Sequence, residues 1–127
     1  MRAEDYYELI ARRRSTRIFK DAPVDDEMLR RVLAAGVEAP TACNRQLWHF
    51  VVVTEPDLKK RISRLSQARQ SYIYDAPVLV AVFYDCTLED RNPCKTPFVS
   101  AAMAMYAILL AAEAEGLGAI YLGGIRK

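Results

Sequence analysis

The sequence predicts a layered α/β or α+β domain in which helices pack on a sheet. Segments with apolar residues at helical spacing alternate along the chain with short β-branched and aromatic runs. The chain has 127 residues, of which 52% are hydrophobic, so it can build one domain with a core of ordinary size. This composition excludes a disordered segment. The sequence contains no internal repeat, linker or low-complexity tract.

Two helices are predicted in the first third of the chain. Apolar residues at helical spacing predict a short helix over residues 5–12, which runs into a cluster of arginines. A second helix begins after Pro23 with an acidic first turn, keeps an apolar face at helical spacing and ends before Pro40.

A strand and a third helix are predicted in the middle of the chain. Residues 48–54 (WHFVVVT) are β-branched and aromatic, which is typical of a strand. The next helix, opened by a proline, carries an apolar stripe of Leu58, Ile62 and Leu65. Its charged residues, including Lys59, are predicted to lie on a solvated face.

The second half of the chain predicts two strands and one long helix. Residues 77–84 (PVLVAVFY) form a continuous apolar run, which predicts a strand in the middle of the sheet, covered on both faces. Thr96 as N-cap and a proline at the first helical position begin an Ala-rich helix that runs to Glu115, with Gly116 placed as the C-cap. Residues 119–122 are predicted to form a last short strand.

Composition excludes several classes of function. The net charge of +2 is too small for a general nucleic-acid binder, so any anion site is local. A single histidine, His49, excludes a metal site built on histidines, and we expect it to be half-buried and structural. The uncharged stretch over residues 96–112 is shorter than the roughly 20 residues that span a bilayer, so we expect a buried helix and no membrane partner. Three irregularly spaced cysteines and a start without a secretory signal pattern predict a reducing compartment, the cytoplasm.

The first candidate site is the segment Arg-Arg-Ser-Thr-Arg. In an extended chain, alternate side chains point the same way, so Arg13, Ser15 and Arg17 are predicted to converge on one face. Two guanidinium groups and a hydroxyl suit a phosphate. A solvated basic helix end fits these residues equally well.

The second candidate site is the loop over residues 39–50, between a helix and a strand. Asn44 and Gln46 each carry donors and acceptors that suit the edge of a flat heterocycle. An ordinary connecting loop could have a similar sequence, but functional residues are often found in loops that rigid elements hold in place. Cys43 in this loop is either a reactive thiol or an inert small side chain.

The third candidate site is a glycine-rich segment over residues 116–124. Glycines after a strand let backbone amides approach a ligand closely. The spacing differs from the G-x-G-x-x-G motif that opens a helix, and by itself the segment is a weak signal.

Taken in order, these three segments resemble the nitroreductase-like family of FMN-dependent oxidoreductases. The likeness runs through RRSTRIF, APTACNRQLWHFVVV, YDAPVLVAVF, a long Ala-rich helix and GLGAIYLGG, and it covers nearly the whole chain. The resemblance implies an α+β fold, a three-layer αβα sandwich with a mainly antiparallel mixed central sheet and helices on both faces. It also implies a single flavin-binding domain over residues 1–127 that lacks the family's usual C-terminal segment.

The same resemblance implies which residues bind the cofactor. In the family, the Arg-Arg-Ser-x-Arg segment holds the phosphate and ribityl region of FMN, a loop from the partner subunit approaches the flavin, and backbone amides at a Gly-Gly step face flavin N5. The positions implied here are Arg13, Arg14, Ser15, Arg17, Pro40, Thr41, Asn44, Gln46, Gly123 and Gly124. No catalytic side chain is implied, because N5 of the flavin carries the chemistry. Leu47 stands where the family has a proline, and Cys43 where it has a small residue.

The implied activity is two-electron hydride transfer from NADH or NADPH to a nitroaromatic, quinone or related acceptor by a ping-pong mechanism. The resemblance also implies a homodimer with flavin sites at the subunit interface and the helix over residues 97–115 in the dimer core. The sequence of that helix is equally compatible with the central helix of a monomer. The alternatives are another flavin reaction on the same fold, such as flavin fragmentation, dehalogenation or peptide dehydrogenation, and a flavin-free dimerisation or binding module.

Overall fold

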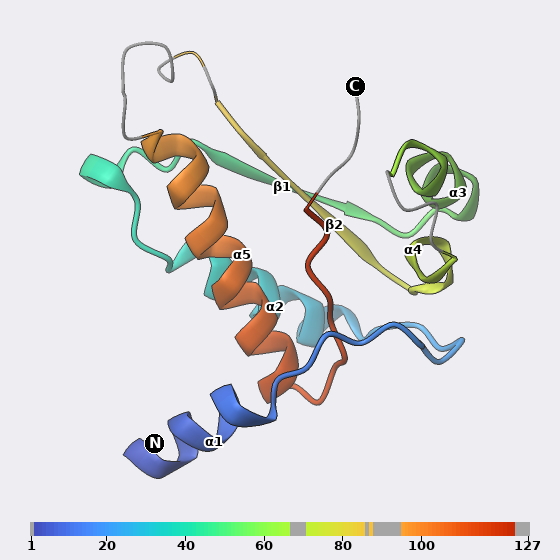
Figure 1. Ribbon diagram of the computed structural model, residues 1–127, viewed down its shortest axis with the longest axis horizontal. Helices are drawn as coiled ribbons and strands as arrows, with labels where there is room; N and C mark the ends of the chain where they lie inside the picture. The colour runs from blue at the N-terminus through green and yellow to red at the C-terminus, as the bar shows by residue number, and fades with distance from the viewer. Residues whose placement is uncertain (1, 67–70, 86, 88–94, 124–127) are drawn as a thin grey trace.

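The computed structural model describes residues 2–66, 71–85, 87 and 95–123 (Figure 1). The elements follow one another as α1 (Ala3–Arg12), α2 (Asp26–Val37), the short 3-10 turn η1 (Ala42–Asn44), β1 (Trp48–Val53), α3 (Pro56–Leu65), α4 (Tyr72–Asp75), β2 (Leu79–Tyr84) and α5 (Thr96–Ala114). Each predicted helix is confirmed, and two of the three predicted strands are present.

The sheet of the described residues is smaller than the mixed central sheet that was predicted. It consists of β1 and β2, paired antiparallel from Trp48 opposite Tyr84 to Val53 opposite Leu79. The prediction that β2 lies mid-sheet and is covered on both faces is wrong for these residues, since β2 has one neighbour and Phe83 is 57% exposed. A short apolar run indicates that a strand is buried, but it does not show how many other strands lie beside it.

The predicted last strand, residues 119–122, is reduced to one isolated bridge. Ala119 pairs with Ser15 in the parallel direction, and no regular ladder continues from it in the described part of the chain. A parallel pair needs several successive backbone bonds to form a strand, and this segment makes one, from Thr16 N to Ala119 O at 3.0 Å.

The core lies where α5 packs along α2 and against one face of the sheet formed by β1 and β2 (Figure 1). Its buried centre is formed by Val32 of α2 with Ile108 and Ala112 of α5. Phe50 of β1 packs on this cluster from the sheet. Gly36 permits the close approach of α2, because a Cβ there would lie 2.8 Å from the side chain of Ile108.

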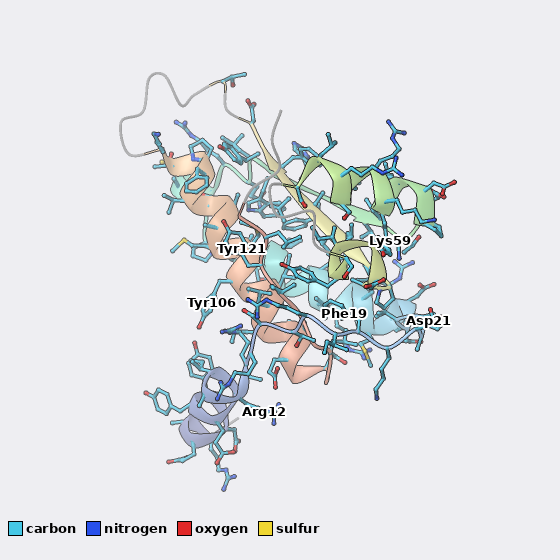
Figure 2. All side chains as sticks on the ribbon, turned by 45° about the vertical axis from the view of Figure 1, so that its right-hand side comes forward. Arg12, Phe19, Asp21, Lys59, Tyr106 and Tyr121 are labelled. Carbon is cyan, nitrogen blue, oxygen red and sulfur yellow. The ribbon has the colours of Figure 1, made fainter. Side chains whose placement is uncertain are left out.

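Helix α3 does not bury the face that its sequence predicts. Lys59 is 8% exposed, while Leu58 and Leu65 are 40% and 55% exposed. The prediction of a solvated Lys59 is therefore wrong. Its Nζ donates a hydrogen bond of 2.7 Å to the carbonyl of Ala76, just after α4 (Figure 2). The aliphatic stem can thus be covered while the ammonium keeps an acceptor.

Helix α5 begins differently from its prediction and is only partly covered. Lys95, not Thr96, is the N-cap, and the proline occupies one of the first two helical positions. In the described part of the chain, α5 is the one helix long and apolar enough to cross a membrane. It packs instead against α2 and both strands, and leaves one apolar stripe at 45–48% exposure, formed by Val99, Met103 and Tyr106.

Candidate functional site

The first and third candidate segments lie side by side. The chain leaves α1 at Arg13 and continues without a helix, and Thr16 then hydrogen-bonds to Ala119 just after α5 (Figure 1). Gly118 lies directly against Thr16, because a Cβ at Gly118 would come within 2.7 Å of the Thr16 side chain. Backbone can approach so closely only where one residue has no side chain. The glycine-rich segment therefore supports the arginine segment.

Two arginines of this segment keep charges that no carboxylate neutralises within the described residues. Arg13 is half-buried and Arg17 is exposed, and the described ion pairs use other arginines. The guanidinium of Arg17 donates only to the carbonyl of Ser15, at 3.4 Å. Unpaired guanidinium groups beside a free hydroxyl suit a phosphate. Their convergence on one ligand stays a prediction.

Arg14 is placed differently from its two neighbours. Its Nη1 donates to the carbonyl of Ala11 and to the carbonyl of Arg13, the latter at 3.0 Å. These bonds satisfy carbonyl groups at the C-terminal end of α1. The alternative of a basic helix end therefore describes Arg14 in this structure.

Two ion pairs fix the end of α5 beside the arginine segment. Arg12 Nε lies 2.7 Å from Glu113 Oε1, and Arg31 binds both carboxylate oxygens of Glu115 at 2.7 and 2.8 Å. The hydrogen bond from Arg31 lowers the pKa of Glu115 and raises the pKa of Arg31. Both pairs join helices that are distant in sequence, so they hold α1 and α2 to the same end of α5.

The chain turns back after α5 through a Schellman motif. Gly116 has φ +76°, and its N–H donates to the carbonyl of Glu113 at 3.1 Å. The N–H of Leu117 donates to the carbonyl of Ala112 at 2.8 Å. The predicted role of Gly116 at this helix end is confirmed, because glycine adopts positive φ without steric cost.

The second candidate loop carries unusual backbone strain. Cys43, Asn44 and Gln46 have φ angles of 52°, 53° and 52°, in the left-handed region that L residues other than glycine rarely adopt. Each such residue costs on the order of 1 kcal/mol or more, and strain of this kind gathers at ligand-binding sites. The carboxamides of Asn44 and Gln46 are exposed and make no hydrogen bond with the described residues. Their donors and acceptors remain free for a ligand.

The same loop is anchored to the N-terminal part of α5. Thr41 Oγ1 accepts a hydrogen bond from the N–H of Gln46 at 3.2 Å, which closes the loop. The N–H of Ala42 donates to Ser100 Oγ of α5 at 3.4 Å. Pro40, the remaining predicted residue of this loop, is exposed and lies beside Thr41.

The arginine segment and the loop lie at opposite ends of α5 (Figure 1). The loop contacts Ser100, and the arginine segment follows the residue that pairs with Glu113. These two positions are 13 residues apart, which corresponds to about 20 Å along a helix axis. One copy of the chain therefore does not bring the two candidate segments together.

Other predicted residues have different outcomes. A Cβ at Gly123 would make only ordinary contacts, the nearest at 3.4 Å to the hydroxyl of Tyr121, so close packing does not explain a glycine there. Gly124 lies outside the described residues, as do Cys86 and Cys94. His49 is exposed, which corrects the expectation of a half-buried histidine. The strand register directs it away from the face that packs on α5.

Sequence reasoning missed the residues that hold the arginine segment in place. Arg12 and Glu113 are 101 positions apart, and no spacing rule connects them. The sequence alone does not distinguish Gly118 from the other glycines of its segment. A surface cavity of about 640 Å³ lies between α3 and α4, and its described lining residues, Lys60, Ser63, Arg64 and Tyr74, belong to none of the candidate segments. No group of three or more His, Cys, Asp or Glu side chains suited to a metal ion occurs in the part of the chain that the structure describes.

Comparisons with known proteins show a family and a fold that this chain shares. The model of the nitroreductase family matches residues 10–69 and 64–127. The chain is 32% identical over 120 residues to a protein of Archaeoglobus fulgidus named "Putative NADH dehydrogenase/NAD(P)H nitroreductase", covering 94% of this chain and 68% of that relative. A crystal structure of a nitroreductase family protein from Clostridium novyi NT superposes with a TM-score of 0.90 at 23% identity, over 96% of this chain and 71% of that one. An FMN-dependent nitroreductase from Clostridium difficile R20291 superposes with a TM-score of 0.76 at 27% identity, over 87% of this chain and 61% of that one.

Proposed function

Because the chain belongs to the nitroreductase family, we propose that it is an FMN-dependent NAD(P)H oxidoreductase. The proposed reaction is two-electron hydride transfer from NADH or NADPH to a nitroaromatic, quinone or related acceptor, in two half-reactions of ping-pong order. The observation that carries this proposal is the arginine segment. Arg13 and Arg17 have no carboxylate partner among the described residues, and the backbone N–H of Thr16 donates a hydrogen bond to the carbonyl of Ala119. We further propose that the protein works in the cytoplasm.

The residues of the arginine segment fit the phosphate of FMN. A phosphate monoester near neutral pH carries between one and two negative charges, and it is held best by charge-assisted hydrogen bonds. Arg13 and Arg17 would supply these bonds and Ser15 a hydroxyl donor. Arg14 would join them only by leaving the carbonyl groups that it caps. When bound, FMN would supply the hydride-transfer chemistry.

The loop between α2 and β1 is proposed to contact the flavin edge from a second copy of the chain. Its carboxamides at Asn44 and Gln46 lie at the other end of α5 from the arginine segment. The exposed apolar stripe of α5 offers the surface on which a second copy would pack, since apolar surface gains free energy when it leaves water. In such a homodimer, each flavin site would combine the arginine segment of one subunit with the loop of the other.

The roles of the remaining predicted residues follow from their places. Pro40 and Thr41 are proposed to shape the loop, because the Thr41 hydroxyl closes it onto the N–H of Gln46. Gly123 and Gly124 are proposed to present backbone amides toward the flavin ring, and this proposal rests on the family resemblance alone.

A titration of FMN with the full chain tests the proposal. We expect saturable quenching of flavin fluorescence, followed by oxidation of NADH or NADPH that depends on a nitroaromatic or quinone. Initial rates at several acceptor concentrations should give parallel double-reciprocal lines, as a ping-pong mechanism requires. A chain that folds and sediments as a dimer but never quenches the flavin would instead support a flavin-free dimerisation module.

A further inference from the structure

The arginine segment is held at both of its ends. On the N-terminal side, Arg12 Nε binds Glu113 Oε1 at 2.7 Å, and Arg12 Nη2 donates to the Glu113 carbonyl at 3.4 Å. On the C-terminal side, Thr16 is bonded to Ala119 and rests against Gly118. Two of the proposed phosphate donors, Arg13 and Ser15, lie between these two contacts, and the third, Arg17, directly follows the second contact.

Glu113 takes part in the ion pair with Arg12 and also in the turn that leads to Gly118. Its backbone carbonyl also accepts the hydrogen bond from the N–H of Gly116 in the Schellman turn. Its side chain is 20% exposed, against 64% for the guanidinium side chain of Arg12. The acidic partner is therefore the better-fixed member of the ion pair, and it belongs to the same short stretch of chain that leads to Gly118.

We propose that Glu113 and Gly118 are positioning residues that hold the arginine segment ready for a phosphorylated ligand. This proposal rests on the proposed function. A segment that is already ordered loses less conformational entropy when it binds, and affinity rises accordingly. Because the two contacts adjoin the phosphate donors and not the α2–β1 loop, their loss should weaken the binding of FMN more than the binding of riboflavin, which lacks the phosphate.

Glu113 gives the sharpest test, because two explanations predict opposite signs. Acting only as a nearby negative charge, Glu113 would repel the phosphate, and Glu113→Gln would tighten FMN binding. As a positioning residue, the same substitution frees Arg12 and loosens the segment, so FMN binding weakens. We expect the dissociation constant for FMN to rise roughly 2- to 10-fold, the effect of one immobilised side chain, and that for riboflavin to rise by a smaller factor.

Glu115→Gln is the matched control. It removes the other ion pair at the same end of α5, and its partner Arg31 lies in α2, whereas Arg12 directly precedes the arginine segment. We expect this variant to lower the melting temperature without changing the ratio of the FMN and riboflavin dissociation constants. Arg12→Lys, which keeps the charge of the pair, should retain most of the FMN affinity that Arg12→Gln loses.

Gly118→Ala tests the second contact independently of charge. The added Cβ would lie 2.7 Å from the side chain of Thr16, so the segment must move away. We expect the same selective loss of FMN affinity. The proposal is overturned if both variants bind FMN as the wild type does, if Glu113→Gln binds it more tightly, or if FMN and riboflavin weaken by the same factor. A wild-type chain that binds neither flavin would instead refute the proposed function itself.

Discussion

Simultaneous removal of Arg13 and Arg17 should abolish most FMN affinity while leaving the fold intact. Neither guanidinium forms an ion pair within the described residues, so each contributes little to the free energy of unfolding. Each would make one charge-assisted bond to the phosphate, of about 1.5–3 kcal/mol. Loss of both corresponds to an increase of about 10²- to 10⁴-fold in the dissociation constant. Flavin fluorescence quenching measures the constant, and circular dichroism measures the melting temperature.

Arg14→Ala is the control for this experiment. Its guanidinium is engaged with the carbonyl groups of Ala11 and Arg13, so its removal should reduce helix stability slightly and FMN affinity much less than the double substitution does. The affinity of the wild-type chain for FMN should also fall as the salt concentration rises, because screening weakens exposed charge pairs. A double variant that keeps wild-type FMN affinity, or an Arg14→Ala variant that loses as much, would refute this assignment.

Three further outcomes are expected. Met103→Glu on the exposed stripe of α5 should shift sedimentation from dimer to monomer, whereas Leu65→Glu on α3 should not; equal behaviour of the two would contradict the proposed interface. Arg31 lowers the pKa of Glu115, so the ion pair stabilises the fold above the ordinary pKa of 4.5 and this stabilisation is lost as pH falls through the lowered value. The difference in melting temperature between wild type and Arg31→Gln should therefore be largest at pH 7 and vanish in strong acid. A difference that grows in acid would contradict a stabilising ion pair between Arg31 and ionised Glu115. Ile73→Ala, at a side chain only 1% exposed, should cost about 2–5 kcal/mol in a urea denaturation, and a cost below about 1 kcal/mol would place Ile73 outside the core.

Local chemistry predicted the helices and several of their ends, although not the N-cap of α5. The acidic start of α2 includes Asp25, whose side chain accepts a hydrogen bond from the N–H of Met28 as an N-cap does. Gly116 adopts the positive φ that a helix end requires. Such signals depend on residues three or four positions apart, so the sequence displays them directly.

Contacts between distant segments could not be predicted in the same way. The burial of Lys59 depends on the carbonyl of Ala76, which directly follows another helix, α4. A rule that places charged side chains on solvent-exposed helix faces does not take into account an acceptor from another segment. The single bridge at Ala119 likewise depends on the path of the chain after α1. Of the candidate site, residue types suggested the donors, whereas the separation of the two segments along α5 is visible only in three dimensions.

That separation has a genetic consequence if two copies share their sites. A copy damaged at Arg13 and Arg17 and a copy damaged at Asn44 and Gln46 would each be inactive alone, since every site would contain one defect. When the two are expressed together, a mixed pair gathers both defects into one site and leaves the other whole. Two alleles that fail separately would then complement each other within a single cell.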